Sequence, residues 1–205
     1  RVRFIFGSSG NFATQIEGGL PVDVFASADV GYVDQLEAKG LVAAGSAQVY
    51  AIGRIVLAFP STAGREPLSM ADLTDDAIGK IAIANPAHAP YGVAARKALT
   101  AAGVWDAVEP RLVLAENASQ AAQFVETGDA GAGIVPLSLA IQAGGALRYV
   151  LIDDALYAPL RQGAAILARS DEPELAAAFL AFVNGPDGRP IMDRYGFVLP
   201  GASAP

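Results

Sequence analysis

Residues 80–102, KIAIANPAHAPYGVAARKALTAA, give the clearest indication of the fold class. The first part, 80–84, is a short apolar run that predicts a buried strand. A loop rich in turn-forming residues follows at 85–92, and the pattern at 93–102 then predicts a helix. Strand, loop and helix in this order are the repeating unit of folds in which helices cover parallel strands.

The same alternation continues on both sides of this stretch. Upstream we expect strands at 2–6, 21–27 and 50–59, a turn at 7–10, and helices at 12–17 and 32–39. Downstream we expect strands at 112–114, 132–135, 148–152 and 164–168, and helices at 120–127, 137–142, 173–183 and 189–195. The sequence therefore predicts an α/β protein with mainly parallel sheets.

Two segments have the features of crossings between lobes. The run 50–59 is long for a single strand and contains Gly53, and the segment 156–162, with Tyr157 and Pro159, could provide the return. We therefore predict a discontinuous first lobe, made of residues 1–52 and 161–205. Residues 53–160 would form the second lobe.

The composition excludes several classes of function. Of the 205 residues, 53% are hydrophobic, and 21 acidic residues against 14 basic ones give a net charge of −7. Such a chain lacks the clustered cations of a nucleic-acid groove, so no nucleic-acid partner is expected. With no cysteine and one histidine, it also lacks the ligands of a thiolate zinc site or a two-histidine metal site.

Catalytic groups are equally scarce. A Ser-His-Asp triad would have to use His88, and no G-x-S-x-G turn is present to hold its serine. The paired carboxylates Asp75-Asp76 and Asp153-Asp154 lie in loops, where turn or capping roles are expected. No phosphate-binding glycine motif occurs. We therefore expect no enzyme, no catalytic residues, no cofactor and no metal ligands, and a structural role for His88.

The sequence offers more groups for anion binding than for catalysis, because three loops each lead from a strand into a helix. They are Gly7-Ser8-Ser9-Gly10, Pro90-Tyr91-Gly92 and residues 115–119. Free backbone N–H groups and the helix dipole favour a negative charge at such positions. An ordinary Gly/Ser turn would explain the first loop equally well. Taken together, the three helix starts suggest a dianion clamped between lobes.

Several segments, in order along nearly the whole chain, resemble periplasmic molybdate-binding proteins. They are FGSSG at 6–10, QIEGG at 15–19, PVDVFASAD at 21–29, NPAHAPYG at 85–92, GVWD at 103–106, GIV at 133–135, GP at 185–186 and RYGF at 194–197. The resemblance implies the two-lobed type II periplasmic-binding-protein fold, which closes over its ligand.

By this resemblance the oxyanion ligands are Ser9, Tyr91 and Ala118. Ser9 would offer its hydroxyl and N–H, and the other two their backbone N–H groups. Ser8 is a weaker candidate, and so is Pro136, which stands where some relatives have a tyrosine whose hydroxyl reaches the anion.

The function implied is capture of molybdate or tungstate for delivery to the membrane permease of an ABC importer. The protein would be exported as a precursor to the bacterial periplasm. An effector-binding half of a transcription regulator, with the same fold, is the alternative, and an enzyme on this fold is a third reading.

The resemblance also implies a difference at the N-terminus. Relatives begin with a strand, a loop carrying another ligand serine, and a helix, about 25–30 residues by ordinary element lengths, before the segment that is 1–6 here. We therefore expect a truncated, incomplete first lobe with exposed strand edges. It would form a homo-oligomer by intermolecular pairing or as a domain-swapped dimer, or else be only partly folded.

Overall fold

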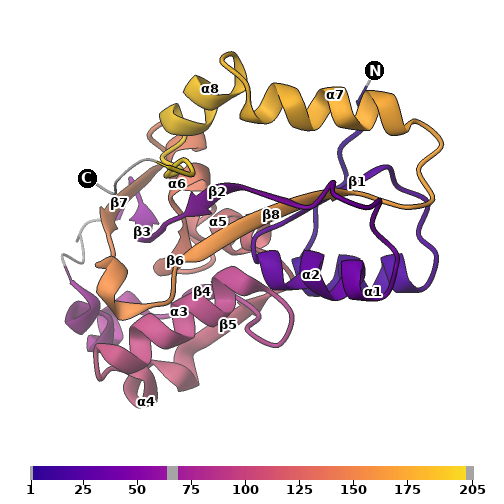
Figure 1. Cartoon of the computed structure of the whole chain (residues 1–205). Helices are drawn as coiled ribbons and strands as arrows, with labels where there is room; N and C mark the ends of the chain where they lie inside the picture. Colours follow the sequence, from indigo (N-terminus) through magenta and orange to yellow (C-terminus); the bar gives the residue numbers. More distant parts are fainter. Residues whose placement is uncertain (1, 64–68, 202–205) are drawn as a thin grey trace. The chain divides into compact units, whose positions relative to one another are not determined.

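The chain is described from a computed structural model, which covers residues 2–63 and 69–201 (Figure 1). It divides into two compact units: residues up to Asn11 with Ile55–Ala158, and Phe12–Arg54 with the residues from Pro159 onward. The chain therefore passes from one unit to the other after Asn11, after Arg54 and after Ala158. Residues 2–11 group with the 55–158 unit, whereas we expected them in the first lobe with residues 12–52.

The larger unit is built on a five-stranded sheet with the order β5-β4-β6-β3-β7. Its strands are β3 (Ile55–Pro60), β4 (Ile81–Ala84), β5 (Leu112–Ala115), β6 (Ala132–Pro136) and β7 (Leu147–Leu151). β4 runs parallel to β5 and β6, while β3 runs antiparallel to β6 and β7. The carboxyl ends of β4, β5 and β6 therefore lie at the same edge of the sheet.

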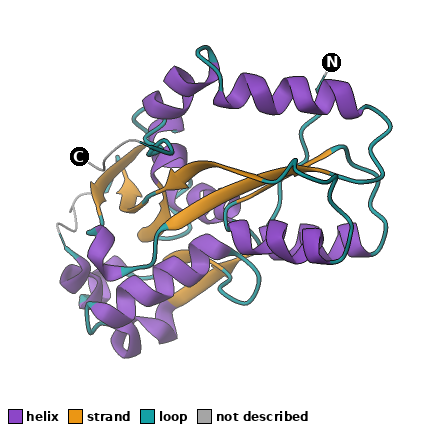
Figure 2. Ribbon diagram, viewed as in Figure 1, coloured by secondary structure: helices purple, strands orange, loops and turns teal. Residues whose placement is uncertain are grey.

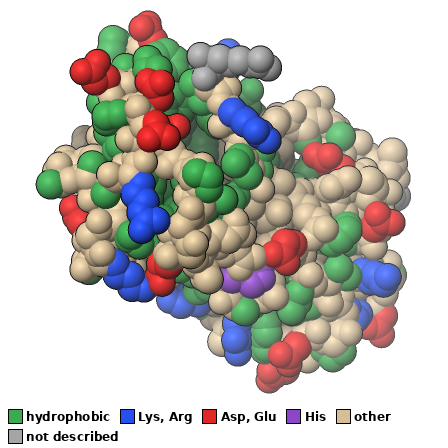
Figure 3. All heavy atoms as spheres, turned by 90° about the vertical axis from the view of Figure 1, so that its right-hand side faces the viewer, with side chains coloured by type: hydrophobic (Ala, Val, Ile, Leu, Met, Phe, Trp, Pro, Cys, Tyr) green, Lys and Arg blue, Asp and Glu red, His purple; other side chains and the backbone are tan. Residues whose placement is uncertain are grey.

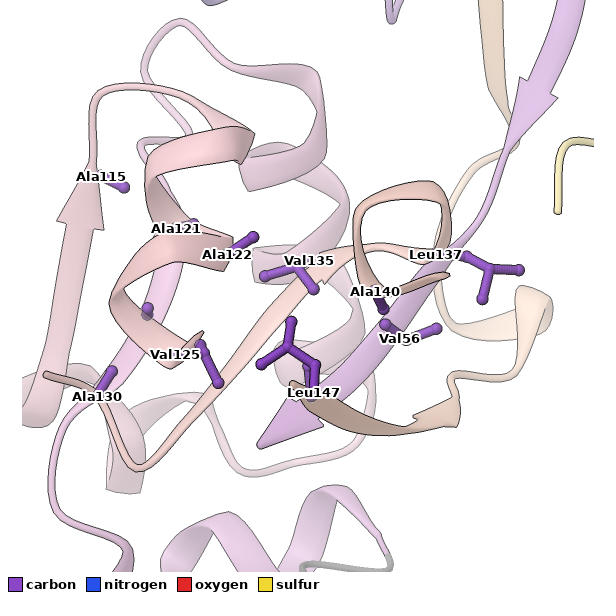
Figure 4. Close-up of a cluster of buried hydrophobic side chains, with 12 residues drawn as sticks. Val56, Ala115, Ala121, Ala122, Val125, Ala130, Val135, Leu137, Ala140 and Leu147 are labelled. Carbon is purple, nitrogen blue, oxygen red and sulfur yellow. The ribbon is translucent and has the colours of Figure 1, made fainter. Parts of the chain in front are cut away.

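Helices flank this sheet (Figure 2). They are α3 (Pro90–Ala101), α4 (Trp105–Val108), α5 (Ala118–Glu126) and α6 (Leu137–Gln142), with short 3₁₀ turns η1 (Met70–Thr74), η2 (Asp76–Ile78), η3 (Glu109–Arg111) and η4 (Asp154–Leu156). Val56 and Val135 pack with Val125 of α5 and Ala140 of α6 in one apolar cluster (Figure 4). Because successive side chains of a strand point to opposite faces of the sheet, Leu57 of β3 points to the face opposite Val56.

The smaller unit has a three-stranded antiparallel sheet with the order β1-β8-β2. Its elements are β1 (Val24–Ser27), α2 (Val30–Ala38), β2 (Gln48–Gly53), β8 (Leu160–Ile166), α7 (Pro173–Asn184) and α8 (Gly188–Arg194); α1 (Ser9–Glu17) begins in the larger unit and continues into this one. Alternation along β8 and just beyond it separates two clusters. Ala165 and Leu167 pack with α1 and α2, and Ala164 and Ile166 with α7.

A partly buried tyrosine and a buried glutamine form a hydrogen bond in the smaller unit. The Tyr50 hydroxyl donates to Gln162 Oε1 at 2.8 Å, and burial raises the pKa of Tyr50 to about 12. Tyr50 therefore stays a neutral donor throughout the physiological range.

Local sequence signals account for several element boundaries. Asp29 caps α2 by accepting from Gly31 N, a role that aspartate favours at a helix start. Asp75 and Asp153 accept from the N–H groups of Ala77 and Ala155, which confirms their expected capping roles. In the described part of the chain, no helix is long and apolar enough to cross a membrane.

The α/β class is confirmed, but the expectation of mainly parallel sheets is wrong. Among the described residues, only the pairings of β4 with β5 and β6 are parallel. The run predicted as one strand at 50–59 is two strands that break at Arg54, so the chain passes from β2 into β3 with no covering helix between them. β3 therefore lies antiparallel to its neighbour β6.

The strand expected at 2–6 is not formed. These residues lie outside both sheets, and Arg1 lies outside the described residues. Val2, Phe4, Ile5 and Phe6 are 57%, 60%, 54% and 81% exposed. The Phe4 and Phe6 rings stack with centroids 6.2 Å apart. The alternating pattern fails because it requires a neighbouring strand, and this segment has none among the described residues.

Candidate anion-binding site

Three loops meet at the carboxyl edge of the five-stranded sheet, and all three belong to the larger unit. The serine turn 7–11 leads into α1, the histidine loop 85–90 follows β4, and the glutamate loop 115–118 follows β5. In open α/β sheets, ligands bind at this edge. Each loop ends in the first turn of a helix of nine or more residues, where N–H groups lack intrahelical partners.

Hydrogen bonds tie these loops to one another. Gly10 N donates to the His88 carbonyl at 3.0 Å, which joins the serine turn to the histidine loop. The Asn11 side-chain amide donates to Glu116 Oε1 at 2.5 Å, which joins the serine turn to the glutamate loop. Asn85 N donates to the Ala115 carbonyl at 2.8 Å, which joins the histidine loop to the glutamate loop. The three helix starts are therefore held together by the chain itself.

The histidine loop is shaped by its own turn residues. Asn85 Oδ1 accepts from Ala87 N at 3.0 Å, and the Asn85 carbonyl accepts from Ala89 N at 2.9 Å. Pro90 occupies the first turn of α3, where its missing N–H costs no hydrogen bond. A Cβ on Gly92 would lie 2.1 Å from the Ala84 carbonyl oxygen, so α3 can approach the end of β4 only with glycine here.

Two side chains of the glutamate loop and α5 accept hydrogen bonds from backbone N–H groups around the start of α5. Asn117 Oδ1 accepts from Gln120 N at 3.0 Å, while Gln120 Oε1 accepts from Glu116 N at 2.7 Å. These bonds fix the first turn of α5 and engage the N–H groups of Glu116 and Gln120. The N–H groups of Ala118 and Ser119, the first two residues of α5, have no intrahelical acceptor.

The serine turn supplies the hydroxyls. Ser8 and Ser9 are only 4% and 7% exposed, which is unusual for polar side chains in a surface turn. Ser8 Oγ lies 2.9 Å from His88 Nδ1 and accepts from Asn11 N at 3.4 Å. Both serines therefore sit at the start of α1 in a structured, desolvated turn. This burial favours a functional role over the alternative of an ordinary Gly/Ser turn.

The three residues predicted as ligands each lie at the start of a helix. Ser9, Tyr91 and Ala118 are the first or second residues of α1, α3 and α5, and Ser8 immediately precedes α1. Pro136 ends β6 at the same sheet edge. It carries no N–H and no hydroxyl, so it offers an anion no conventional donor.

Two connections in the site were not expected from the sequence. The first helix was expected to begin at residue 12, yet α1 begins at Ser9 and the Asn11 side chain reaches Glu116. His88 was expected to shape its loop, but its ring also contacts Ser8. No spacing rule predicts either bond, because the partners are 105 and 80 residues apart.

Charged side chains are arranged differently from these neutral groups. On the face shown in Figure 3, Lys and Arg side chains are scattered among acidic ones, and the single His side chain reaches the surface. Among the described residues, no group of three or more His, Cys, Asp or Glu side chains could hold a metal ion. The three loops themselves offer neutral hydrogen-bond donors, an arrangement that suits an anion.

A mixed α/β chain in two units, with several helix N-termini gathered at one sheet edge, has the architecture of a solute-binding protein. The family model for bacterial extracellular solute-binding proteins matches residues 1–198, and the chain belongs to this family. The family consists of binding proteins and not of enzymes.

Relatives of known name support this assignment. The chain is 36% identical over 197 residues to the molybdate-binding protein ModA of Rhodobacter capsulatus, covering 96% of this chain and 77% of that protein. It is also 36% identical to ModA of Azotobacter vinelandii, again over 77% of that protein. The solved structure of the periplasmic molybdate-binding protein of Azotobacter vinelandii matches with a TM-score of 0.88 and 34% identity, covering 95% of this chain and 85% of that one.

Proposed function

We propose that this protein binds molybdate or tungstate at the three linked helix starts. The observation that carries the proposal is the set of hydrogen bonds joining the serine turn, the histidine loop and the glutamate loop, with Ser8 and Ser9 buried among them. The names of the relatives described above supply the identity of the anion. Sensing within a transcription regulator is not favoured, since those relatives are binding proteins.

The proposed ligands are neutral donors. Ser9 would donate from its hydroxyl and N–H, and Tyr91 and Ala118 from their backbone N–H groups. Each lies in the first turn of a helix, where the dipole contributes a partial positive charge. Hydrogen bonds to a charged acceptor are worth about 1.5–3 kcal/mol each, so several well-aimed neutral donors can hold a dianion. We assign no donor role to Pro136.

The cellular role follows from the family. We propose that the protein acts in the bacterial periplasm and delivers its oxyanion to the membrane permease of an ABC importer. Molybdate and tungstate have the same charge and tetrahedral shape, so a site of this kind would accept both.

Thermal denaturation with molybdate, tungstate, sulfate and phosphate tests the proposal. Ligand at a hundredfold excess over Kd stabilises the folded state by about 2.7 kcal/mol, which corresponds to a rise in Tm of roughly 5–10 °C for a chain of this size. We expect that rise with molybdate and tungstate and a much smaller one with sulfate or phosphate. No rise with any of the four anions would contradict the proposal.

A further inference from the structure

The ring and the carbonyl of His88 both contact the serine turn. The carbonyl accepts from Gly10 N at 3.0 Å, and Nδ1 lies 2.9 Å from Ser8 Oγ. Ser8 is 4% exposed, so bulk water has little access to its hydroxyl. The bonding of this hydroxyl is therefore decided by the protein groups around it.

A serine hydroxyl has one proton to donate and two lone pairs that accept. Asn11 N–H already donates to Ser8 Oγ at 3.4 Å and uses one lone pair. If His88 Nδ1 carries no proton, it accepts the only proton that Ser8 has. If Nδ1 carries a proton, either in the Nδ1–H tautomer of the neutral ring or in the imidazolium, it donates to the second lone pair, and the Ser8 proton becomes available to another acceptor.

We propose that the neutral ring of His88 carries its proton on Nε2, so that Nδ1 accepts the Ser8 proton, and that protonation of Nδ1 frees Ser8 to donate to the bound oxyanion. His88 is then a positioning residue, and anion binding is coupled to proton uptake. This inference rests on the proposed function and adds a form of regulation to the same site. Affinity rises as the pH falls through the neutral range, because the imidazolium both releases the Ser8 proton and places a positive charge near the dianion.

Few other groups can produce this pH dependence. The serine turn carries no titratable side chain, the histidine loop leads to Tyr91, and the glutamate loop carries Glu116, whose Oε1 accepts from the Asn11 amide. Carboxylates and phenols keep a constant charge between about pH 6 and 8, whereas imidazoles change theirs there. Molybdate stays a dianion over the same interval, so it is the anion to use.

Calorimetric titration of the whole chain with molybdate at about pH 6, 7 and 8 tests the inference. Linkage limits the effect of one proton to about tenfold in Kd per pH unit. We expect tighter binding at pH 6, with proton uptake revealed by buffers of different ionisation enthalpy. Ser8→Ala should remove the pH dependence while His88 is still present. His88→Asn places an amide that can donate to Ser8 at every pH, so its Kd should stay nearly constant between pH 6 and 8.

The outcomes separate this inference from the proposed function. Binding of molybdate with no pH dependence, or an equal dependence in Ser8→Ala, overturns the inference and leaves the proposed function intact. No binding at any pH overturns both.

If His88→Asn does not fold, proton NMR on the unmodified chain gives an independent result. His88 is the only histidine, so its ring signal needs no assignment. Addition of molybdate at pH 7 should change this signal toward that of the imidazolium, and an unchanged signal contradicts the inference.

Discussion

The anion-binding loops and the outer face of α3 are two regions of the same unit that could attract an anion, and they differ in kind. The loops offer neutral donors and buried serines. The outer face of α3 has a groove of about 680 Å³, lined by Arg96, Lys97, Leu156 and Tyr157 among others, with the Arg96 guanidinium 5.0 Å from the centre of the Trp105 ring. The cations of the groove are exposed and hydrated, whereas the donors of the loops are fixed by the fold.

This difference indicates that preorganisation decides where a small dianion binds. Exposed charges are screened within about 8–10 Å at physiological ionic strength, and mobile side chains must be ordered to act. Backbone N–H groups at helix starts are already ordered and need no countercharge. The net charge of −7 is therefore compatible with anion binding.

The largest effect is expected from Gly92→Ala. Its Cβ would lie 2.1 Å from the Ala84 carbonyl oxygen, so α3 must move away from β4 and take Tyr91 with it. We expect molybdate binding to be lost and the free energy of unfolding to fall by about 1–3 kcal/mol, measured by calorimetry and chemical denaturation. Gly40→Ala is the control, because it adds a methyl group at φ +69° with no atom within 4 Å. Equal affinity in Gly92→Ala and the unmodified chain would contradict the assigned role of the histidine loop.

The next largest effect is expected from Ser9→Ala. Loss of one hydrogen bond to a charged ligand costs about 1.5–3 kcal/mol, or roughly ten- to 150-fold in Kd. Ser69→Ala is the matched control, since it also removes a hydroxyl before a helical turn but lies outside the three loops. Unchanged affinity in Ser9→Ala, measured by calorimetric titration, would show that the serine turn does not contact the anion.

A much smaller effect is expected from removing both cations of the α3 groove. The double substitution Arg96→Ala with Lys97→Ala should change the Kd for molybdate by less than about fivefold, because exposed charges contribute about 0–1 kcal/mol. The titration is best run at low and high salt, since any long-range contribution must fade as salt rises. A tenfold loss at both salt concentrations would move the binding site toward the groove.

The smallest expected effect on binding comes from the exposed segment 2–6, which should instead affect self-association. Its four apolar side chains are each more than half exposed, so we expect concentration-dependent association, reduced by Phe4→Ser with Phe6→Ser. Size-exclusion chromatography with light scattering measures this, with Leu175→Ser, at a position 64% exposed on α7, as the control. A compact monomer at every concentration would contradict the expectation.

The sequence predicts local features better than it predicts which strands pair or which loops come into contact. The capping roles of Asp75 and Asp153, the α/β alternation and the three helix starts could be read from residue order, because each depends on neighbours a few positions away. The failed strand at 2–6 and the antiparallel entry of β3 depend on which strands become neighbours in space. The bond between Ser8 and His88 depends on two loops far apart in the sequence.

Anomalous diffraction from crystals soaked in tungstate tests the central claim most directly, because the heavy atom marks its own position. The account predicts one strong peak at the three helix starts, with the anion oxygens within hydrogen-bond distance of the N–H groups of Ser9, Tyr91 and Ala118. A peak in the groove beside Arg96 and Lys97, with none at the helix starts, would contradict it.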